Sequence, residues 1–161
     1  SLGEFSNAGL LVMIFLMFVG ASPGSTGGGI KTSTLFALIQ GIKTAATNTS
    51  GKAFHYSVPH GVFRKASVIA VMGISVIAVG TFMLCAFEPD IAIRDALFEM
   101  TSAFGTVGLT TGITTGLCTA SKLTSIVMMY IGRLGPLTIA TLWYFTNGDR
   151  IKYPDGNIAI G

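Results

Sequence analysis

Two glycine-rich stretches and one arginine are the parts of this chain whose residue types and spacing could do chemistry. The first stretch, GASPGSTGGGIKTST at residues 20–34, is close to the phosphate-binding pattern G-x-x-x-x-G-K-[ST]. Gly24 and Gly29 have the spacing of the two glycines in that pattern, but Ile30 then intervenes before Lys31. The stretch also follows an apolar segment, whereas the pattern requires a preceding β-strand. A phosphate-binding loop is therefore the less favoured interpretation.

The same stretch has the composition of a narrow, irregular segment inside a membrane. Such backbone is tolerated at membrane depth only where it is buried in protein or lines water. Glycines allow a narrow and flexible loop, hydroxyl side chains can hydrogen-bond the freed backbone, and a lysine would repel a passing cation. We therefore predict a gate loop, and the alternative is a helix kink without a gating role. The predicted gate residues are Gly20, Ser22, Gly24, Ser25, Thr26, Gly27, Gly28, Gly29 and Lys31.

The second stretch, TSAFGTVGLTTG at residues 101–112, contains a Thr-Val-Gly triplet close to the core of potassium filters. Such a segment directs successive backbone carbonyls at a dehydrated cation and replaces its water shell. A short helix before the triplet would point its negative C-terminal end at the same cation. We predict an ion filter here, with a structural turn as the alternative. The predicted filter residues are Thr106, Val107, Gly108 and Leu109.

Arg133 is the third candidate, because it interrupts the apolar segment 123–145. A charge at mid-membrane is usually paired or faces a cavity. No acid lies in any predicted span, so its expected partners are freed carbonyls or a hydroxyl of the glycine-rich loop, and we predict a gate latch. The alternative is an arginine that only holds helices together. No metal site is predicted beyond that of a transported ion, because Cys85 and Cys118 lie far apart with no C-x-x-C motif.

Composition indicates that these candidates are positioned by membrane helices. Hydrophobic residues make up 50% of the 161 residues and charged residues only 11%, against about 25% charged in average soluble domains. The net charge of +3 is modest, and its residues lie in loops, which fits the positive-inside rule better than nucleic-acid binding. We therefore predict an all-α membrane protein with no nucleic-acid partner.

The apolar segments predict how the chain crosses the membrane. Residues 66–87 and 123–145 are long enough for complete spans, whereas 8–21 is a short half-span that leads into the glycine-rich loop. A half-span, a glycine-rich break and a second half is typical of a discontinuous membrane helix. Residues 90–112 are predicted to form a re-entrant pore helix and filter. The expected order is span, pore loop, span, preceded by one broken span.

Charges orient these segments. Lys43, Lys52, Arg64 and Lys65 carry only positive charge between the first two apolar segments, whereas EPDIAIRD at 88–95 is mostly acidic. The positive-inside rule therefore places 44–65 in the cytoplasm, 88–122 outside, and the tail again in the cytoplasm.

Other titratable residues are less informative. Asp95 and Glu99 lie one helical turn apart on the predicted pore helix, and we expect outer-mouth or buried hydrogen-bonded acids rather than a binding site. His55 and His60 are expected to contact lipid headgroups or a partner.

Three motifs in order resemble the Ktr/Trk/HKT superfamily of potassium transporters: MFVGASPGSTGGGIKTSTL, LFEMTSAFGTVGLTTG and YIGRLGPLTIA. The form SPGSTGGGIKT is most similar to the membrane subunit of the bacterial Ktr system. The resemblance implies four span–pore loop–span repeats in a potassium-channel-like pore. It assigns the parts of the chain as follows: 1–50 to the second span of the third repeat, interrupted by the gating loop 20–34; 51–65 to a cytoplasmic linker; 66–146 to the fourth repeat; and 147–161 to a cytoplasmic tail.

The resemblance also implies a function. Potassium would be taken up across a bacterial plasma membrane by a multi-pass pore subunit that is not an enzyme and holds no covalently bound cofactor. Gly108 would be the filter glycine, residues 20–34 would gate the pore below it, and Arg133 would face that loop. The family implies a homodimer on a cytosolic nucleotide-binding regulatory ring, with sodium as a coupling ion.

The departure from the family is length. Two repeats and the third filter are missing, so we expect a C-terminal piece that does not conduct alone. The alternatives are a nucleotide-binding membrane subunit that uses the glycine-rich loop, and a non-conducting remnant.

Overall fold

A computed structural model describes residues 5–47, 52–53, 56–57, 60–135 and 138. Its helices are α1 (Asn7–Phe18), α2 (Thr32–Thr47), α3 (His60–Phe87), α4 (Ile93–Gly105) and α5 (Thr119–Leu134). A 3₁₀ turn, η2 (Ile113–Gly116), precedes α5. The strands β1 (Lys52–Ala53) and β2 (Tyr56–Ser57) form a two-residue antiparallel pair. Apart from that pair, the prediction of an all-α chain is confirmed for these residues.

The long helix α3 is the clearest candidate for a membrane span. Its segment Gly61–Phe87 is 27 residues long and contains an 18-residue stretch with a mean hydropathy of 2.5, enough to cross a bilayer by length and composition, while α1 is apolar but shorter. Among the described residues, no other helix is both as long and as apolar. The helix ends at Phe87, where the sequence predicted the end of the span, but it begins at His60 rather than 66. Helix α3 thus begins six residues before the apolar run, because long polar side chains such as those of Arg64 and Lys65 can reach water from a helix end.

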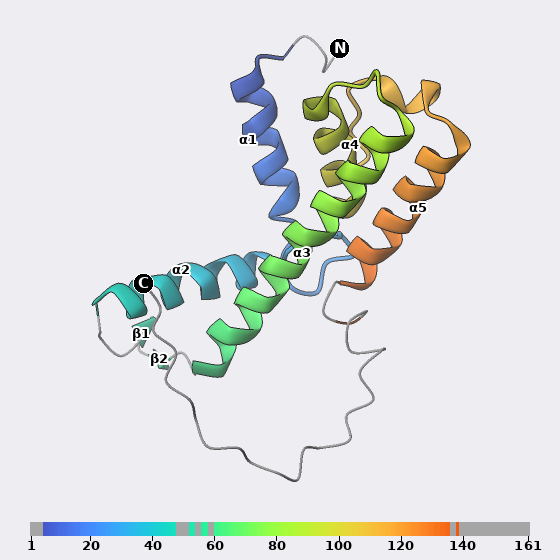
Figure 1. Cartoon of the computed structure of the whole chain (residues 1–161). Helices are drawn as coiled ribbons and strands as arrows, with labels where there is room; N and C mark the ends of the chain where they lie inside the picture. Colours follow the sequence, from blue (N-terminus) through green and yellow to red (C-terminus); the bar gives the residue numbers. More distant parts are fainter. Residues whose placement is uncertain (1–4, 48–51, 54–55, 58–59, 136–137, 139–161) are drawn as a thin grey trace, which may run out of the picture.

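Helix α4 lies in the middle of the molecule, between α1, α3 and α5 (Figure 1). All residues from Phe98 to Gly105 are buried. Apolar side chains from three helices pack around it, because an amphipathic helix must cover its apolar face. The larger cluster consists of Ile77, Leu84, Ala96, Met100, Ala103, Phe104, Leu117 and Met128, and a smaller one of Leu10, Met17 and Phe98 joins α4 to α1.

The residues of the predicted broken span form two separate helices. Helix α1 ends at Phe18, α2 begins at Thr32, and α2 leaves at a steep angle to α1 (Figure 1). It packs against the first half of α3, where the backbone at Gly41 lies against the ring of Phe63. The second half of the broken span therefore does not continue along the direction of the first.

Helix α5 begins earlier and ends earlier than the apolar segment 123–145. It starts at Thr119 and ends at Leu134, because Gly135 takes a φ of 86° that a helix cannot contain. Arg133 consequently lies in the last turn of α5 and not in the middle of a continuous helix. Residues 139–145 of the predicted span and the predicted tail 147–161 lie outside the described residues.

Candidate functional site

The predicted filter begins where α4 ends, inside the molecule. Thr106 takes a left-handed conformation with φ 52° and ψ 38°, which stops the helix. The N–H of Thr106 donates to the carbonyl of Ala103, and that of Val107 donates to the carbonyl of Ser102, 3.0 Å away in both cases. The C-terminal end of α4, which carries partial negative charge, therefore faces the start of this irregular segment.

The segment after Thr106 has no regular secondary structure up to η2. Gly108 has a φ of 82°, which other residues adopt only with strain, and no atom lies within 4 Å of where its Cβ would be. The side chains of Val107 and Leu109 are 45% and 36% exposed. The four predicted filter residues are thus consecutive on one irregular stretch, which begins half-buried at Thr106 and is exposed from Val107 to Leu109.

The glycine-rich loop contacts the first residue of that stretch. The N–H of Gly28 donates to Oγ1 of Thr106 over 2.9 Å. Gly28 is buried, and a Cβ on it would come within 2.8 Å of the Phe104 carbonyl oxygen. Only a glycine fits so close to the end of α4. The sequence identified both segments, but nothing in their spacing predicted this contact.

Backbone hydrogen bonds close the base of the loop. The N–H of Gly20 donates to the carbonyl of Ile30 over 2.8 Å, and the N–H of Ile30 donates to the carbonyl of Phe18 over 3.0 Å. These bonds form a single parallel bridge between Val19 and Ile30, which we call the neck. A loop of residues 21–29 is therefore tied at both ends.

The loop also folds on itself above the neck. Nζ of Lys31 donates to the carbonyl of Ser25 over 3.4 Å, and the N–H of Gly27 donates to Oγ of Ser25 over 3.3 Å. A Cβ on Gly20 would lie only 2.0 Å from the carbonyl oxygen of Gly28. Ser22, Gly24 and Thr26 lie in the exposed part of the loop, and Gly29 has a φ of 81°. The predicted gate residues thus form one compact loop.

Phe104, two residues before Thr106, is where several elements meet. Its ring stacks on Phe18 with ring centroids 6.4 Å apart, which joins α4 to α1. A Cβ on Gly132 would lie 1.8 Å from the carbonyl oxygen of Phe104. The backbone of α5 is therefore in close contact with the backbone of α4 at this point, which only a glycine permits. Gly73 on α3 lies against the same ring. The end of α4 is therefore fixed by three neighbouring helices.

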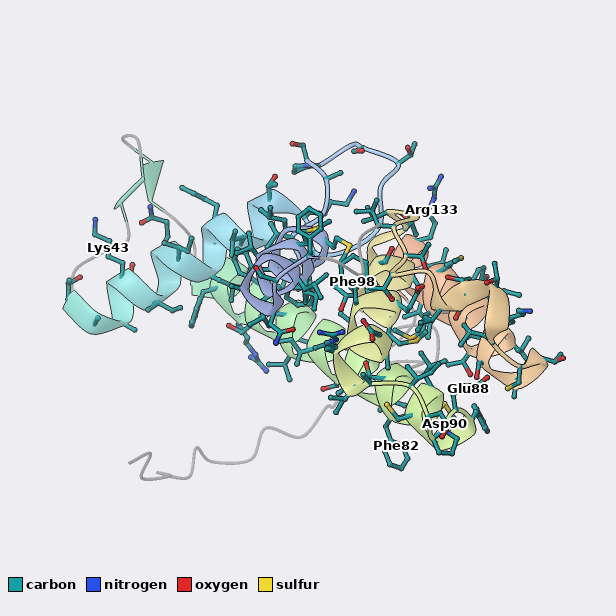
Figure 2. All side chains as sticks on the ribbon, turned by 90° about the horizontal axis from the view of Figure 1, so that it is seen from above. Lys43, Phe82, Glu88, Asp90, Phe98 and Arg133 are labelled. Atoms are coloured by element: carbon teal, nitrogen blue, oxygen red, sulfur yellow. The ribbon has the colours of Figure 1, made fainter. Side chains whose placement is uncertain are left out.

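Arg133 lies near this arrangement but is exposed. Figure 2 shows its side chain on the side of the molecule where the glycine-rich loop lies. Within the described part of the chain, no hydrogen bond or ion pair joins Arg133 to the loop. The structure therefore brings the gate and filter residues into contact and leaves the proposed latch beside them.

Glu99 is a buried acid behind the predicted filter. Its side chain is 8% exposed, and its Oε1 accepts hydrogen bonds from the hydroxyls of Thr110 and Thr114. The sequence predicted an outer-mouth or buried hydrogen-bonded acid, and for Glu99 the second is confirmed. It did not identify the two threonines. Asp95, one turn earlier, lies 3.6 Å from Nε of its neighbour Arg94.

Glu88, just after α3, caps α5 from a distant part of the chain. Its Oε1 accepts the N–H of Cys118 over 2.6 Å and the hydroxyl of Ser121 over 3.4 Å. The negative carboxyl group thus lies at the positive N-terminus of α5. The pKa of Glu88 is lowered, first by the N–H of Cys118, then by the Cys118 thiol, the Ser121 hydroxyl and the Lys122 charge, against an opposing effect of desolvation. The sequence analysis missed this contact.

In the described part of the chain, no group of three or more His, Cys, Asp and Glu side chains lies close enough together to hold a metal ion. The groups that this site presents are mainly backbone groups. They belong to the irregular stretch after α4 and to the glycine-rich loop, which is hydrogen-bonded to Thr106, the first residue of that stretch.

Comparison with known proteins relates this chain to cation transport proteins. The chain matches the TrkH family, described as "Cation transport protein", over residues 1–151. It is 34% identical over 160 residues to the Ktr system potassium uptake protein B of Bacillus subtilis, and 36% identical over 161 residues to the protein of the same name from Vibrio alginolyticus. It is also 36% identical over 165 residues to the potassium/sodium uptake protein NtpJ of Enterococcus hirae.

These alignments cover nearly all of this chain but only part of each relative. The matched share of this chain is 99% for the Bacillus and Vibrio proteins and 98% for the Enterococcus protein. The share of the relative is 36%, 35% and 37%, respectively. The chain therefore spans just over a third of the length of the relatives it matches.

Proposed function

Because this chain belongs to the TrkH family of cation transport proteins, we propose that it forms part of a pore for potassium uptake across a bacterial cell membrane. Three observations support the proposal. Two of the relatives above are named for potassium uptake and a third for potassium and sodium. The segment Gly61–Phe87 is long and apolar enough to cross a bilayer. The contact between the glycine-rich loop and the end of α4 is suited to a controlled ion path.

We propose that Thr106, Val107, Gly108 and Leu109 contribute one part of the selectivity filter. A short buried helix ends inside the molecule, and its negative end favours a cation at that point. The backbone after it is irregular, so its carbonyls are free of helical hydrogen bonding and available to replace water around an ion. In this proposal α3, α4 and α5 form one span–pore loop–span unit, and the remaining units complete the filter.

The glycine-rich loop is the proposed gate. The single observation that carries this assignment is the hydrogen bond from Gly28 to Oγ1 of Thr106, because it joins the loop directly to the first filter residue. A loop in this position would lie under the filter and obstruct the path of an ion. Arg133, in the last turn of α5, places its guanidinium group on the same side of the molecule as the loop. In this proposal it would bind the loop and hold the gate closed.

The assembly of the whole protein is part of the same proposal. We propose a homodimer on a cytosolic nucleotide-binding regulatory ring, with sodium as a coupling ion, as the resemblance to the Ktr system implies. One relative is named for both potassium and sodium, which supports a link to sodium.

The filter assignment is tested by replacing Gly108 with serine in the protein that carries this chain. A Cβ is tolerated sterically, since no atom lies within 4 Å, but the φ of 82° becomes strained, at a cost of about 1–2 kcal/mol. The backbone should relax and its carbonyls should shift. We expect the ratio of potassium to sodium uptake to fall about tenfold, measured as ion flux into proteoliposomes. Gly116→Ala, also with open space around its Cβ, is the control and should leave the ratio unchanged.

An unaltered ratio in Gly108→Ser would contradict the filter assignment. Loss of all uptake, with the protein still folded and monodisperse in detergent, would support a role in conduction but not in selectivity.

A further inference from the structure

Glu99 is buried deep in α4, a position where a carboxyl group needs hydrogen-bond partners. With 8% of its surface exposed, it lies among Phe98, Met100 and Thr101, which are almost completely buried. Burial without such partners would be unfavourable for an acid. The two threonine hydroxyls that satisfy Glu99 both come from the stretch that returns from the predicted filter, and none comes from α4 itself.

The hydroxyls connect Glu99 to the backbone of that returning stretch. The N–H of Gly112 donates to Oγ1 of Thr110 over 2.9 Å, and the Thr110 hydroxyl donates to Oε1 of Glu99. Thr114 lies 2.7 Å from the Thr110 hydroxyl and 3.1 Å from the same carboxyl oxygen. A continuous chain of hydrogen bonds therefore runs from the backbone at Gly112 to the interior of α4.

Within the described part of this chain, a cavity rather than packed side chains lies against this stretch. A cavity of about 370 Å³ lies between α4, the stretch and α5, and its lining includes Glu99, Thr106, Gly108, Thr110 and Ser125. Val107 and Leu109 are 45% and 36% exposed. Because side chains of this chain do not fill the cavity beside the stretch, the hydrogen bonds to Glu99 are the local contacts that support its shape.

We propose that Glu99 is a positioning residue for the filter, which it holds through Thr110, and that this support sets how well the pore discriminates potassium from sodium. The inference rests on the proposed filter at residues 106–109. Glu99 touches no ion in this proposal. It fixes the position of the backbone whose carbonyls do, because a filter that can relax fits a smaller ion as well as a larger one.

The test compares Thr110→Val with Thr111→Val in the protein that carries this chain. Both changes replace a hydroxyl by a methyl group of similar size. Thr110 connects Gly112 to Glu99, whereas the buried Oγ1 of Thr111 has no hydrogen-bond partner among the described residues. In Thr110→Val we expect the ratio of potassium to sodium uptake to fall about 2- to 10-fold. In Thr111→Val it should stay within about twofold of the unmodified protein.

A double-variant cycle separates a shared pathway from two independent effects. Glu99→Ala should lower the ratio at least as much as Thr110→Val, and the double variant should lower it no further than the larger single change. Additive losses would mean that the two side chains act separately, and an unchanged ratio in Thr110→Val would overturn the proposal.

Amide hydrogen exchange tests the same support without any transport measurement. We expect the Gly112 amide to exchange faster in both Thr110→Val and Glu99→Ala, and at an unchanged rate in Thr111→Val. Unchanged exchange in the first two variants would overturn the positioning role. If the unmodified protein takes up no potassium, the proposed function is wrong, and the exchange rates still decide whether Glu99 supports this stretch.

Discussion

At the scale of single residues, Thr106 combines two roles that would normally be separate. It is the one non-glycine residue with positive φ in the described part of the chain, a conformation unusual for a β-branched side chain. Strain of this kind costs about 1–3 kcal/mol and persists where the surroundings fix it. Here the backbone bonds at the end of α4 and the hydrogen bond from Gly28 do so. One residue therefore ends the helix with its backbone and binds the loop with its side chain.

Glu88 leads to a prediction on pH. Its pKa in the folded protein lies below its ordinary value of 4.5, so its contribution to stability is fully present above that value. The contribution is lost as pH falls through the lower folded pKa. We expect Glu88→Gln to lower the melting temperature at pH 7, and the difference from the unmodified protein to shrink below about pH 4. Thermal unfolding in detergent, followed by tryptophan fluorescence or light scattering, measures both.

Asp90→Asn is the matched control for that experiment. Asp90 is exposed on the same segment and should leave the melting temperature unchanged. A difference between Glu88→Gln and the unmodified protein that stays constant down to pH 3 would mean that the charge of Glu88 does not hold the start of α5.

At the scale of elements, apolar runs predicted where the helices lie, and glycines predicted where they break. Helix α3 ends at Phe87, where the apolar run ends and a charged residue follows, and α4 ends at Gly105, just before the predicted filter residues. The direction of α2 was not predictable, since a break in a span does not say how the chain continues. The end of α5 at Leu134 depends on the conformation of Gly135, and glycine is also common inside membrane helices.

The candidate site was predictable as segments but not as contacts. The filter and gate residues stand out by type, whereas the bonds of Gly28 to Thr106 and of Thr110 to Glu99 join residues that no spacing rule connects. Hydroxyl groups are common in loops, and only the fold selects which of them meet. The departure from the phosphate-binding pattern at Ile30 also has a structural reason, because Ile30 is buried and supplies both backbone bonds of the neck.

The glycine-rich loop gives a prediction at this scale. Deleting residues 24–29 should remove the proposed obstruction and raise potassium flux. Gly28→Ala should act in the same direction, because a Cβ would lie 2.8 Å from the Phe104 carbonyl and push the loop away from Thr106. Loss of one hydrogen bond of about 0.5–1.5 kcal/mol predicts a rise in the open fraction of about 2- to 10-fold. Flux into proteoliposomes measures both variants.

The control is Gly116→Ala, which introduces the same methyl group where no atom lies within 4 Å. It should conduct like the unmodified protein. Unchanged flux in both the deletion and Gly28→Ala would rule out the loop as a gate.

At the scale of the whole molecule, the charges at the two ends of α3 predict an orientation in the membrane. Its first turns carry Arg64 and Lys65, both exposed, and the segment after its end carries Glu88 and Asp90. The positive-inside rule places the beginning of α3 in the cytoplasm and its end outside. In this orientation the proposed filter would open to the outside, and the glycine-rich loop would lie on its cytoplasmic side, where a gate can control inward movement.

Cysteine labelling tests this orientation. In a form of the protein that is otherwise free of cysteine, with Cys85 and Cys118 replaced by serine, Asp90→Cys should react with a membrane-impermeant maleimide in intact cells. Lys65→Cys should react only after the membrane is permeabilised. The reverse pattern would invert the proposed topology, and labelling of both in intact cells would mean that α3 does not cross the membrane.

The neck between Val19 and Ile30 has a consequence for how such a protein can diversify. The backbone bonds at Phe18, Gly20 and Ile30 hold both ends of the loop together. The residues between these ends can therefore be substituted as one segment. Its length and composition can change without altering the register of α1 or the direction of α2. Chimeras that keep the neck, Gly28 and Gly29 and replace only residues 21–27 would then vary the rate of ion entry and leave the contact with Thr106 in place, so ion entry and ion preference could be tuned independently.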